Sequence, residues 1–184
     1  IRMRLVGSEM CIRDRYQDPE GLTWTRQFSI YDETDSQTLV KEIVGQDMSL
    51  DPKRFDPKKI KRAISNAKNQ CFTANDLEEK ADNHFDKIIA DAYRRYRISL
   101  SKNNALDFDD LLLLPVFLLR QNDLVRDYWH KRFQHVLVDE YQDTNRTQYE
   151  LIKLITAGNT EPSKFSKWND LSLIHISEPT RRIL

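Results

Sequence analysis

The sequence predicts a mostly α-helical fold that contains one strand–turn–helix unit. Apolar residues recur at three- and four-residue spacings through residues 36–100, which is the period of amphipathic helices. Further along, the apolar run from His135 to Val138 leads directly into two carboxylates, Asp139 and Glu140, and a second helical pattern follows. A continuous run rich in β-branched residues suits a strand buried on both faces of a parallel sheet.

The two ends of the chain are interpreted as translated sequencing adapter. The codons GAG ATG TGT ATA AGA GAC would encode residues 9–14, and their reverse complement, read one base in, encodes residues 172–177. Two natural termini have no reason to be antisense translations of each other, although a genuine basic N-terminal arm is the alternative. We therefore exclude residues 1–15 and 171–184 from fold reasoning and expect 16–170 to be an internal fragment of a longer protein.

Composition limits the class of protein. The chain has 29 basic and 29 acidic residues, and removing the six basic and three acidic residues of the two ends leaves 23 and 26, a net charge of −3. Overall charge therefore does not indicate a nucleic-acid binder. Cys71 alone remains in the natural segment, so no disulfide can form within it. No apolar run approaches the length of a membrane span, and we expect a cytoplasmic protein with no membrane partner.

The first part of the natural segment, 16–35, is expected to be a connecting segment with a short extended piece at 28–31. The polar residues 32–36 offer several candidate N-caps for a helix. That helix presents an apolar face from Leu39 to Val44, and Gly45 is a plausible stop.

The next helix carries the most basic stretch of the natural segment. Asp56 followed by Pro57 forms an N-cap and first-turn pair. One face of the helix holds apolar residues, and we assign the basic residues to the other face: Lys58, Lys59, Lys61, Arg62 and Lys68. A solvated helix face is the simpler interpretation, and DNA phosphate contact by Lys61, Lys68 and Asn69 is the functional alternative.

Two further helices are predicted before residue 104. Thr73 with Asp76 resembles a capping box, and the short helix that it opens is expected to end near Asp82. A longer helix then carries an aromatic stripe that includes Tyr93 and Tyr96. We interpret this stripe as a core face, while the interleaved arginines 94, 95 and 97 leave base stacking as the alternative.

Residues 107–121 predict a helix buried in a large core. Asp107 is a natural N-cap, and Asp110 sits near the positive end of the helix. The residues from 111 to 119 are apolar all round, and Pro115 is expected to kink the helix. Asp109 with Asp110 could be interpreted as a metal pair, but capping is the favoured role.

The acidic turn after residue 138 predicts chemistry on phosphates. A short helix at 122–129 precedes the strand, and after the turn Thr144 or Asn145 caps a helix that Gly158 ends. Ligands of parallel sheets bind at the carboxyl ends of strands, so Asp139 and Glu140 stand where a phosphate would be handled. In this Walker B pattern the aspartate holds Mg²⁺, and the next carboxylate orients or deprotonates the attacking water. The alternative is that the acidic residues only cap the next helix.

Two sequence motifs resemble those of superfamily 1 DNA helicases of the UvrD/Rep/PcrA type. VDEYQDTN at 138–145 resembles motif II of that family, and ALDFDDLLLL at 105–114 resembles a second motif at the usual distance upstream. The resemblance implies a fragment of a RecA-like P-loop NTPase domain. Residues 36–104 would be its helical insertion domain, and 105–170 part of the first motor domain.

The same resemblance implies function. It suggests an ATP-dependent 3′-to-5′ DNA helicase acting in repair or replication, with ATP and Mg²⁺ as cofactors. Its partners would be single-stranded DNA and single-strand/duplex junctions, and the oligomeric state stays open. Asp139 would bind the metal and Glu140 would activate water. Gln142 would belong with the catalytic residues and Asp143 with the nucleotide contacts, both coupling the nucleotide state to neighbouring motifs.

A phosphate-cradling loop is missing from the sequence. Such a loop needs glycines followed by Lys-Ser or Lys-Thr, and no glycine of the chain is followed by either pair: Gly7, Gly21, Gly45 and Gly158. We therefore expect the fragment alone to be inactive. Two alternatives for the parent remain, namely a helicase subunit of a recombination helicase–nuclease and a non-enzymatic helical interaction module.

Overall fold

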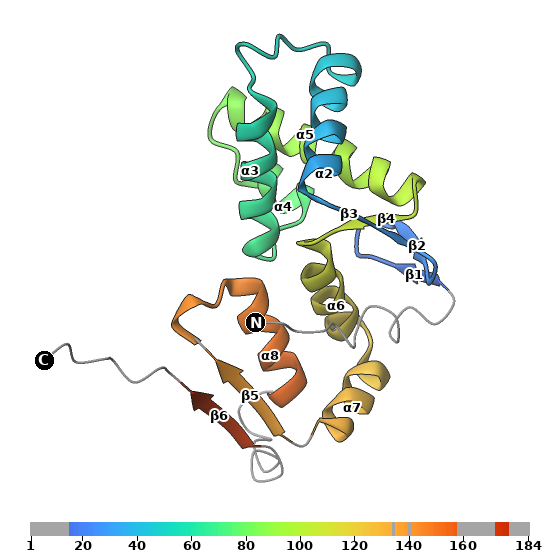
Figure 1. Cartoon of the computed structure of the whole chain (residues 1–184), viewed down its shortest axis with the longest axis vertical. Coiled ribbons are helices and arrows are strands. Elements are labelled where there is room, and N and C mark those ends of the chain that lie inside the picture. Colours follow the sequence, from blue (N-terminus) through green and yellow to red (C-terminus); the bar gives the residue numbers. More distant parts are fainter. Residues whose placement is uncertain (1–14, 134, 140, 158–171, 177–184) are drawn as a thin grey trace, which may run out of the picture.

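The structure is a computed structural model that describes residues 15–133, 135–139, 141–157 and 172–176. The described chain is mostly helical and carries a strand–turn–helix unit toward its C-terminal end, as predicted (Figure 1). The helices are α2 (Glu33–Glu42), η1 (Ile43–Asp47), α3 (Pro57–Asn69), α4 (Ala74–Glu79), α5 (His84–Lys102), α6 (Asp110–Gln121), α7 (Asp123–Arg132), η2 (Tyr141–Asp143) and α8 (Arg146–Ala157). The strands are β1 (Arg15–Gln17), β2 (Thr23–Thr25), β3 (Ser29–Tyr31), β4 (Ala105–Asp107), β5 (His135–Asp139) and β6 (Ser172–Ile176).

Helices α2 to α5 are inserted between two neighbouring parallel strands. β3 pairs in parallel with β4, with Ile30 opposite Leu106, and parallel neighbours need a crossover connection. Here the whole helical segment is that crossover, and Figure 1 shows it as the upper part of the molecule. The extended piece predicted at 28–31 is confirmed, whereas β4 was not predicted because a three-residue strand shows no alternation of its own.

The upper part has its own apolar core. Tyr93 and Tyr96 of α5 are fully buried there with Ile60 and Ile64 of α3 and Val40 of α2. The aromatic stripe is therefore a core face, as favoured above, and its tyrosine rings are not available to stack on bases.

A second apolar core lies between α6, α7 and α8. The apolar residues of α6 from Leu113 to Leu119 are buried in it, together with Trp129 of α7 and Leu151 of α8. The antiparallel hairpin of β1 and β2 adds Tyr16 and Trp24. The indole nitrogen of Trp24 donates to the carbonyl of Ala105 at 2.9 Å, which ties the hairpin to β4.

Two predicted helix features differ in the structure. Gly45 does not stop the first helix, because the chain continues as the wide turn η1 and the amide of Met48 donates to the carbonyl of Ile43 at 2.9 Å. Burial of Ile43 and Val44 explains the continuation, and the left-handed residue after it is Ser49, with φ 51°. The short helix α4 ends at Glu79 rather than near Asp82.

The predicted strand at 135–139 is confirmed, but one of its faces is open. Val138 is buried, whereas Leu137 is 63% exposed. β5 pairs in parallel with β6, with Leu137 opposite Ile174, and β6 lies in the C-terminal segment that we interpret as adapter. The prediction of a strand buried on both faces was therefore wrong for this chain, since a larger sheet would be needed to cover Leu137.

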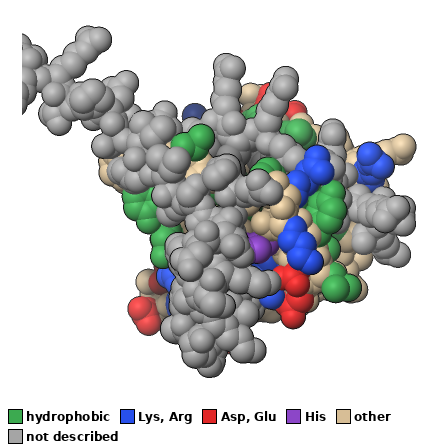
Figure 2. Space-filling view, turned by 90° about the horizontal axis from the view of Figure 1, so that it is seen from below, with side chains coloured by type: hydrophobic (Ala, Val, Ile, Leu, Met, Phe, Trp, Pro, Cys, Tyr) green, Lys and Arg blue, Asp and Glu red, His purple; other side chains and the backbone are tan. Residues whose placement is uncertain are grey.

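Viewed from below, the described part of the surface carries basic side chains next to acidic and apolar ones (Figure 2). Within the part of the chain that the structure describes, no helix has both the length and the apolar character to cross a bilayer.

Candidate active site

The turn that follows β5 presents its polar residues to solvent. Asp139 is the last residue of β5, while its side chain and the whole of Glu140 lie outside the described residues. Gln142 and Asp143 lie on η2 and are exposed. The hydroxyl of Thr144 donates to the carbonyl of Tyr141 at 2.7 Å and closes this turn.

The helix after the turn begins with a reciprocal cap. The amide of Gln148 donates to Asn145 Oδ1 at 2.9 Å, and the amide of Asn145 donates to Gln148 Oε1 at 3.0 Å. Two backbone donors that the first turn of a helix leaves unpaired are thereby satisfied. Of the two caps that the sequence allowed, Thr144 and Asn145, the structure uses Asn145, which marks where the acidic turn ends.

The first turn of α8 contacts the C-terminal end of α3. The side-chain nitrogen Nδ2 of Asn145 donates to Asn69 Oδ1 at 2.6 Å. The hydroxyl of Thr147 donates to the carbonyl of Lys68 at 2.6 Å and accepts from the amide of Cys71 at 3.2 Å. The helical segment 33–102 therefore contacts the cap and first turn of α8, which directly follow the acidic turn. The sequence does not predict this contact.

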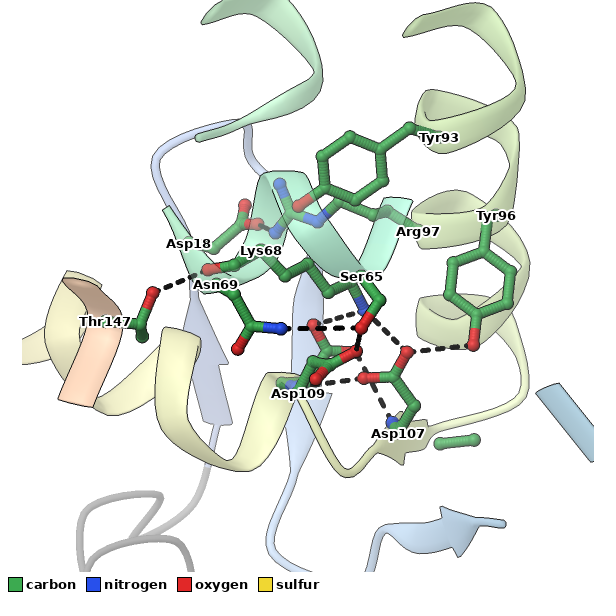
Figure 3. Close-up of polar contacts among 12 residues, drawn as sticks. Asp18, Ser65, Lys68, Asn69, Tyr93, Tyr96, Arg97, Asp107, Asp109 and Thr147 are labelled. Carbon is green, nitrogen blue, oxygen red and sulfur yellow. Dashed lines mark hydrogen bonds and ion pairs between the residues drawn. The ribbon is translucent and has the colours of Figure 1, made fainter. Parts of the chain in front are cut away.

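A buried ion cluster lies between α3, β4 and the start of α6 (Figure 3). Lys68 Nζ is fully buried and lies 2.8 Å from Asp107 Oδ2 and 2.8 Å from Asp110 Oδ1. The hydroxyl of Tyr96 donates to Asp107 Oδ2 at 2.9 Å, and that of Ser65 donates to Asp109 Oδ2 at 2.7 Å. Asp107 also accepts from the amide of Asp110 at 2.9 Å. It is the last residue of β4, however, and α6 begins at Asp110 with Asp109 at the cap position, so the prediction of Asp107 as the N-cap was wrong by two residues.

Burial and charge set the ionisation of this cluster. Burial alone would raise the pKa of Asp107, but the Lys68 ammonium outweighs it and holds that pKa below its usual value. Burial and then the charge of Asp107 raise the pKa of Asp110 to about 6. Burial would lower the pKa of Lys68, but the two carboxylates raise it above its usual value. At neutral pH the cluster thus holds two carboxylates with two buried ammonium groups, that of Lys68 at 2.8 Å from each carboxylate and that of Lys61 at 3.9 Å from Asp107.

The assignment of Lys61 and Lys68 to a solvated, DNA-contacting face was wrong for this structure. Both side chains are almost completely buried, and Lys61 Nζ lies 3.7 Å from Asp109 Oδ2. The helical period places residues 61, 64 and 68 on one stripe that faces the core. Asn69 accepts from Asn145 rather than standing free. Three basic side chains of α3 do face solvent: Lys58, Lys59 and Arg62.

Arg97 forms a second buried ion cluster. Its guanidinium is buried and pairs with Asp18 and Glu20 of the β1–β2 connection. This contact joins the hairpin to α5 and removes Arg97 from any surface that could stack on bases. The available sequence signal was spacing, since Arg97 follows Tyr93 by four residues and therefore shares its face of the helix.

Among the side chains that the structure describes, no three His, Cys, Asp or Glu residues are arranged to hold a metal ion. The carboxylate of Asp109 instead contacts Ser65 and Lys61, and that of Asp110 pairs with Lys68.

Comparisons with known proteins agree with the motifs. Residues 8–173 match the model of the UvrD/REP helicase N-terminal domain. The chain is 38% identical over 146 residues to the ATP-dependent DNA helicase PcrA of Staphylococcus epidermidis, covering 79% of this chain and 20% of that protein. It is 37% identical over 148 residues to PcrA of Staphylococcus aureus, covering 80% of this chain and 20% of that protein.

Proposed function

The chain belongs to the UvrD/REP helicase family, and we propose that the full-length protein containing it is an ATP-dependent DNA helicase. The chain spans about a fifth of the length of the curated relatives that it matches, so the activity belongs to the longer protein. The observation that carries the proposal is the acidic turn at the carboxyl end of β5, which leads into a capped α8.

Asp139 and Glu140 would perform the chemistry at this turn. Carboxylate oxygens are ligands that Mg²⁺ prefers, and the backbone places Asp139 at the carboxyl end of β5, the end of a strand at which ligands bind in parallel sheets. Asp139 would hold the Mg²⁺ that arrives with ATP. Glu140 would accept a proton from the attacking water or orient it toward the terminal phosphate.

Gln142 and Asp143 would report the nucleotide state. Both lie on η2, one turn beyond the metal residue, and both are exposed in this chain. Their position next to the nucleotide would let Asp143 contact it and Gln142 pair with the attacking water or a neighbouring motif.

The finer parts of the proposal follow from the family. We place β5, α8 and the second core in a RecA-like motor domain, with residues 36–104 as its helical insertion. Movement would be 3′ to 5′ on single-stranded DNA up to a duplex junction, in cytoplasmic DNA repair or replication. With Lys61 and Lys68 buried, phosphate contact by α3 would fall to Lys58, Lys59 and Arg62.

Strand displacement by the full-length protein tests this function. We expect ATP-dependent unwinding of a duplex with a 3′ single-stranded tail and little unwinding of one with a 5′ tail. Glu140→Gln should abolish unwinding, whereas Glu79→Gln, at an exposed position at the end of α4, should leave it unchanged. Unwinding that survives Glu140→Gln would contradict the assigned role.

The chain alone should neither hydrolyse ATP nor unwind DNA, because it lacks a Gly-Lys-Ser or Gly-Lys-Thr loop. Phosphate release by the purified chain that disappears in Glu140→Gln would overturn this expectation.

A further inference from the structure

We propose that the C-terminal turn of α3 positions the acidic turn for ATP hydrolysis, with Asn69 as the positioning residue. The inference rests on the proposed function and goes beyond it, because it gives the helical segment a direct mechanical contact with the ATP-hydrolysing turn. Two hydrogen-bonded contacts carry it, one through Asn145 and one through Thr147.

The first contact has a fixed direction. Asn145 Oδ1 already accepts from the amide of Gln148, so the other end of its side chain, the donor nitrogen, must face Asn69. Asn69 Oδ1 is 2.6 Å away and accepts this bond. The residue that caps α8 is therefore held by a residue of α3, and five residues, 140–144, separate that cap from the end of β5.

The second contact is buried. Thr147 is 1% exposed, and its hydroxyl donates to the Lys68 carbonyl while accepting from the Cys71 amide. Cys71 has φ 60°, a left-handed conformation that costs about 1 kcal/mol or more for a residue other than glycine. The left-handed residue Cys71 thus contacts α8, and its backbone amide donates to the hydroxyl of Thr147.

The C-terminal end of α3 is held in place because the side chain of Lys68 is buried in the ion cluster. The carbonyl of Lys68 accepts a hydrogen bond from Thr147, and its ammonium pairs with Asp107 and Asp110 (Figure 3). One residue therefore links β4 and α6 to the first turn of α8. Sliding α3 along its axis would separate the ammonium from its two carboxylates, and breaking a buried pair is strongly destabilising.

The consequence for the turn is positional. Residues 140–144 connect the end of β5 to the cap of α8, and Asn69 holds that cap. Groups that act on an attacking water must be held closely in place, because small displacements lower the rate strongly. Loss of the Asn69–Asn145 bond should therefore slow hydrolysis more than it weakens ATP binding.

The test compares three variants of the full-length protein. Asn69→Ala removes the acceptor, whereas Asn69→Asp keeps an oxygen facing the Asn145 donor. Asn66→Ala is the matched control, because it makes the same change at an exposed position of the same helix. ATP hydrolysis gives kcat and KM, and amide hydrogen exchange over residues 141–149 reports the order of the turn.

We expect Asn69→Ala to lower kcat about fivefold to tenfold, the equivalent of one hydrogen bond, with KM for ATP within about twofold of wild type. Exchange at 141–149 should speed up in the same variant. Asn66→Ala and Asn69→Asp should both stay close to wild type. Asn69→Ala that matches Asn66→Ala in kcat and in exchange would overturn the inference, as would a change in KM alone.

The two proposals fail in different ways. If the wild-type protein does not hydrolyse ATP, the proposed function fails. The exchange comparison still decides whether Asn69 holds the turn, because it needs no turnover: equal exchange in Asn69→Ala and Asn66→Ala would overturn the positioning role. If the wild type hydrolyses ATP and Glu140→Gln does not, the function stands while Asn69 is judged separately.

Discussion

Replacing Lys68 with methionine tests whether the buried ion cluster holds α3 against β4 and α6. Methionine keeps much of the apolar stem but removes the charge that balances Asp107 and Asp110. Breaking a buried pair by removing one partner costs about 3–5 kcal/mol, because the remaining charge stays desolvated. With two carboxylates left behind, we expect a loss at the upper end of this range at pH 7, measured by urea unfolding of the chain with tryptophan fluorescence.

The control is Lys59→Met, which changes the same residue type at an exposed position of the same helix. It should change the free energy of unfolding by no more than about 0.5 kcal/mol. The effect of Lys68→Met should shrink as the pH falls from 7 to 5. Loss of the Lys68 ammonium raises the pKa of each carboxylate relative to wild type, so the folded variant takes up protons and regains stability on acidification. A loss no larger than that of Lys59→Met, or one independent of pH, would refute the buried-cluster account.

Two further substitutions follow from the same contacts. Burial and then the charge of Asp107 raise the pKa of Asp110 to about 6 in the folded state, so the contribution of Asp110 to stability falls as the pH rises from 5 to 7. Asp110→Asn should therefore remove roughly 1–2 kcal/mol of the difference in unfolding free energy between pH 5 and pH 7, and an unchanged difference would contradict it. Arg97→Met should cost about 3–5 kcal/mol by leaving Asp18 buried without its cation, and amide exchange at 23–25 should speed up; an unchanged urea midpoint would argue against this.

Local signals in the sequence located several elements of the site. The cap at Asn145 depends on residues within three positions of it, and the strand ending at Asp139 depends on one short apolar run. The Asp56–Pro57 pair likewise marked the start of α3. These features could be predicted because the groups that satisfy one another are close neighbours in the chain.

Contacts between distant residues could not be found in this way. The side chain of Lys68 is satisfied by Asp107 and Asp110, whose positions depend on how the whole helical segment folds back between β3 and β4. A lysine is ordinarily exposed, so the pattern of α3 alone predicts that all its lysines face solvent. The bond between Asn69 and Asn145 escaped prediction for the same reason, since asparagine side chains carry no strong preference between solvent and partner.

A single-turnover comparison of ATP binding and ATP cleavage tests whether the turn after β5 is the hydrolytic half of an ATPase site. In the full-length protein, Glu140→Gln removes the carboxylate that would act on water but leaves Asp139 to hold the metal. We expect ATP to bind within a few-fold of wild type and its cleavage to slow by about 10²-fold or more. Cleavage at the wild-type rate would contradict the assignment of this turn as the hydrolytic half of an ATPase site, and so would a variant whose whole defect is lost binding.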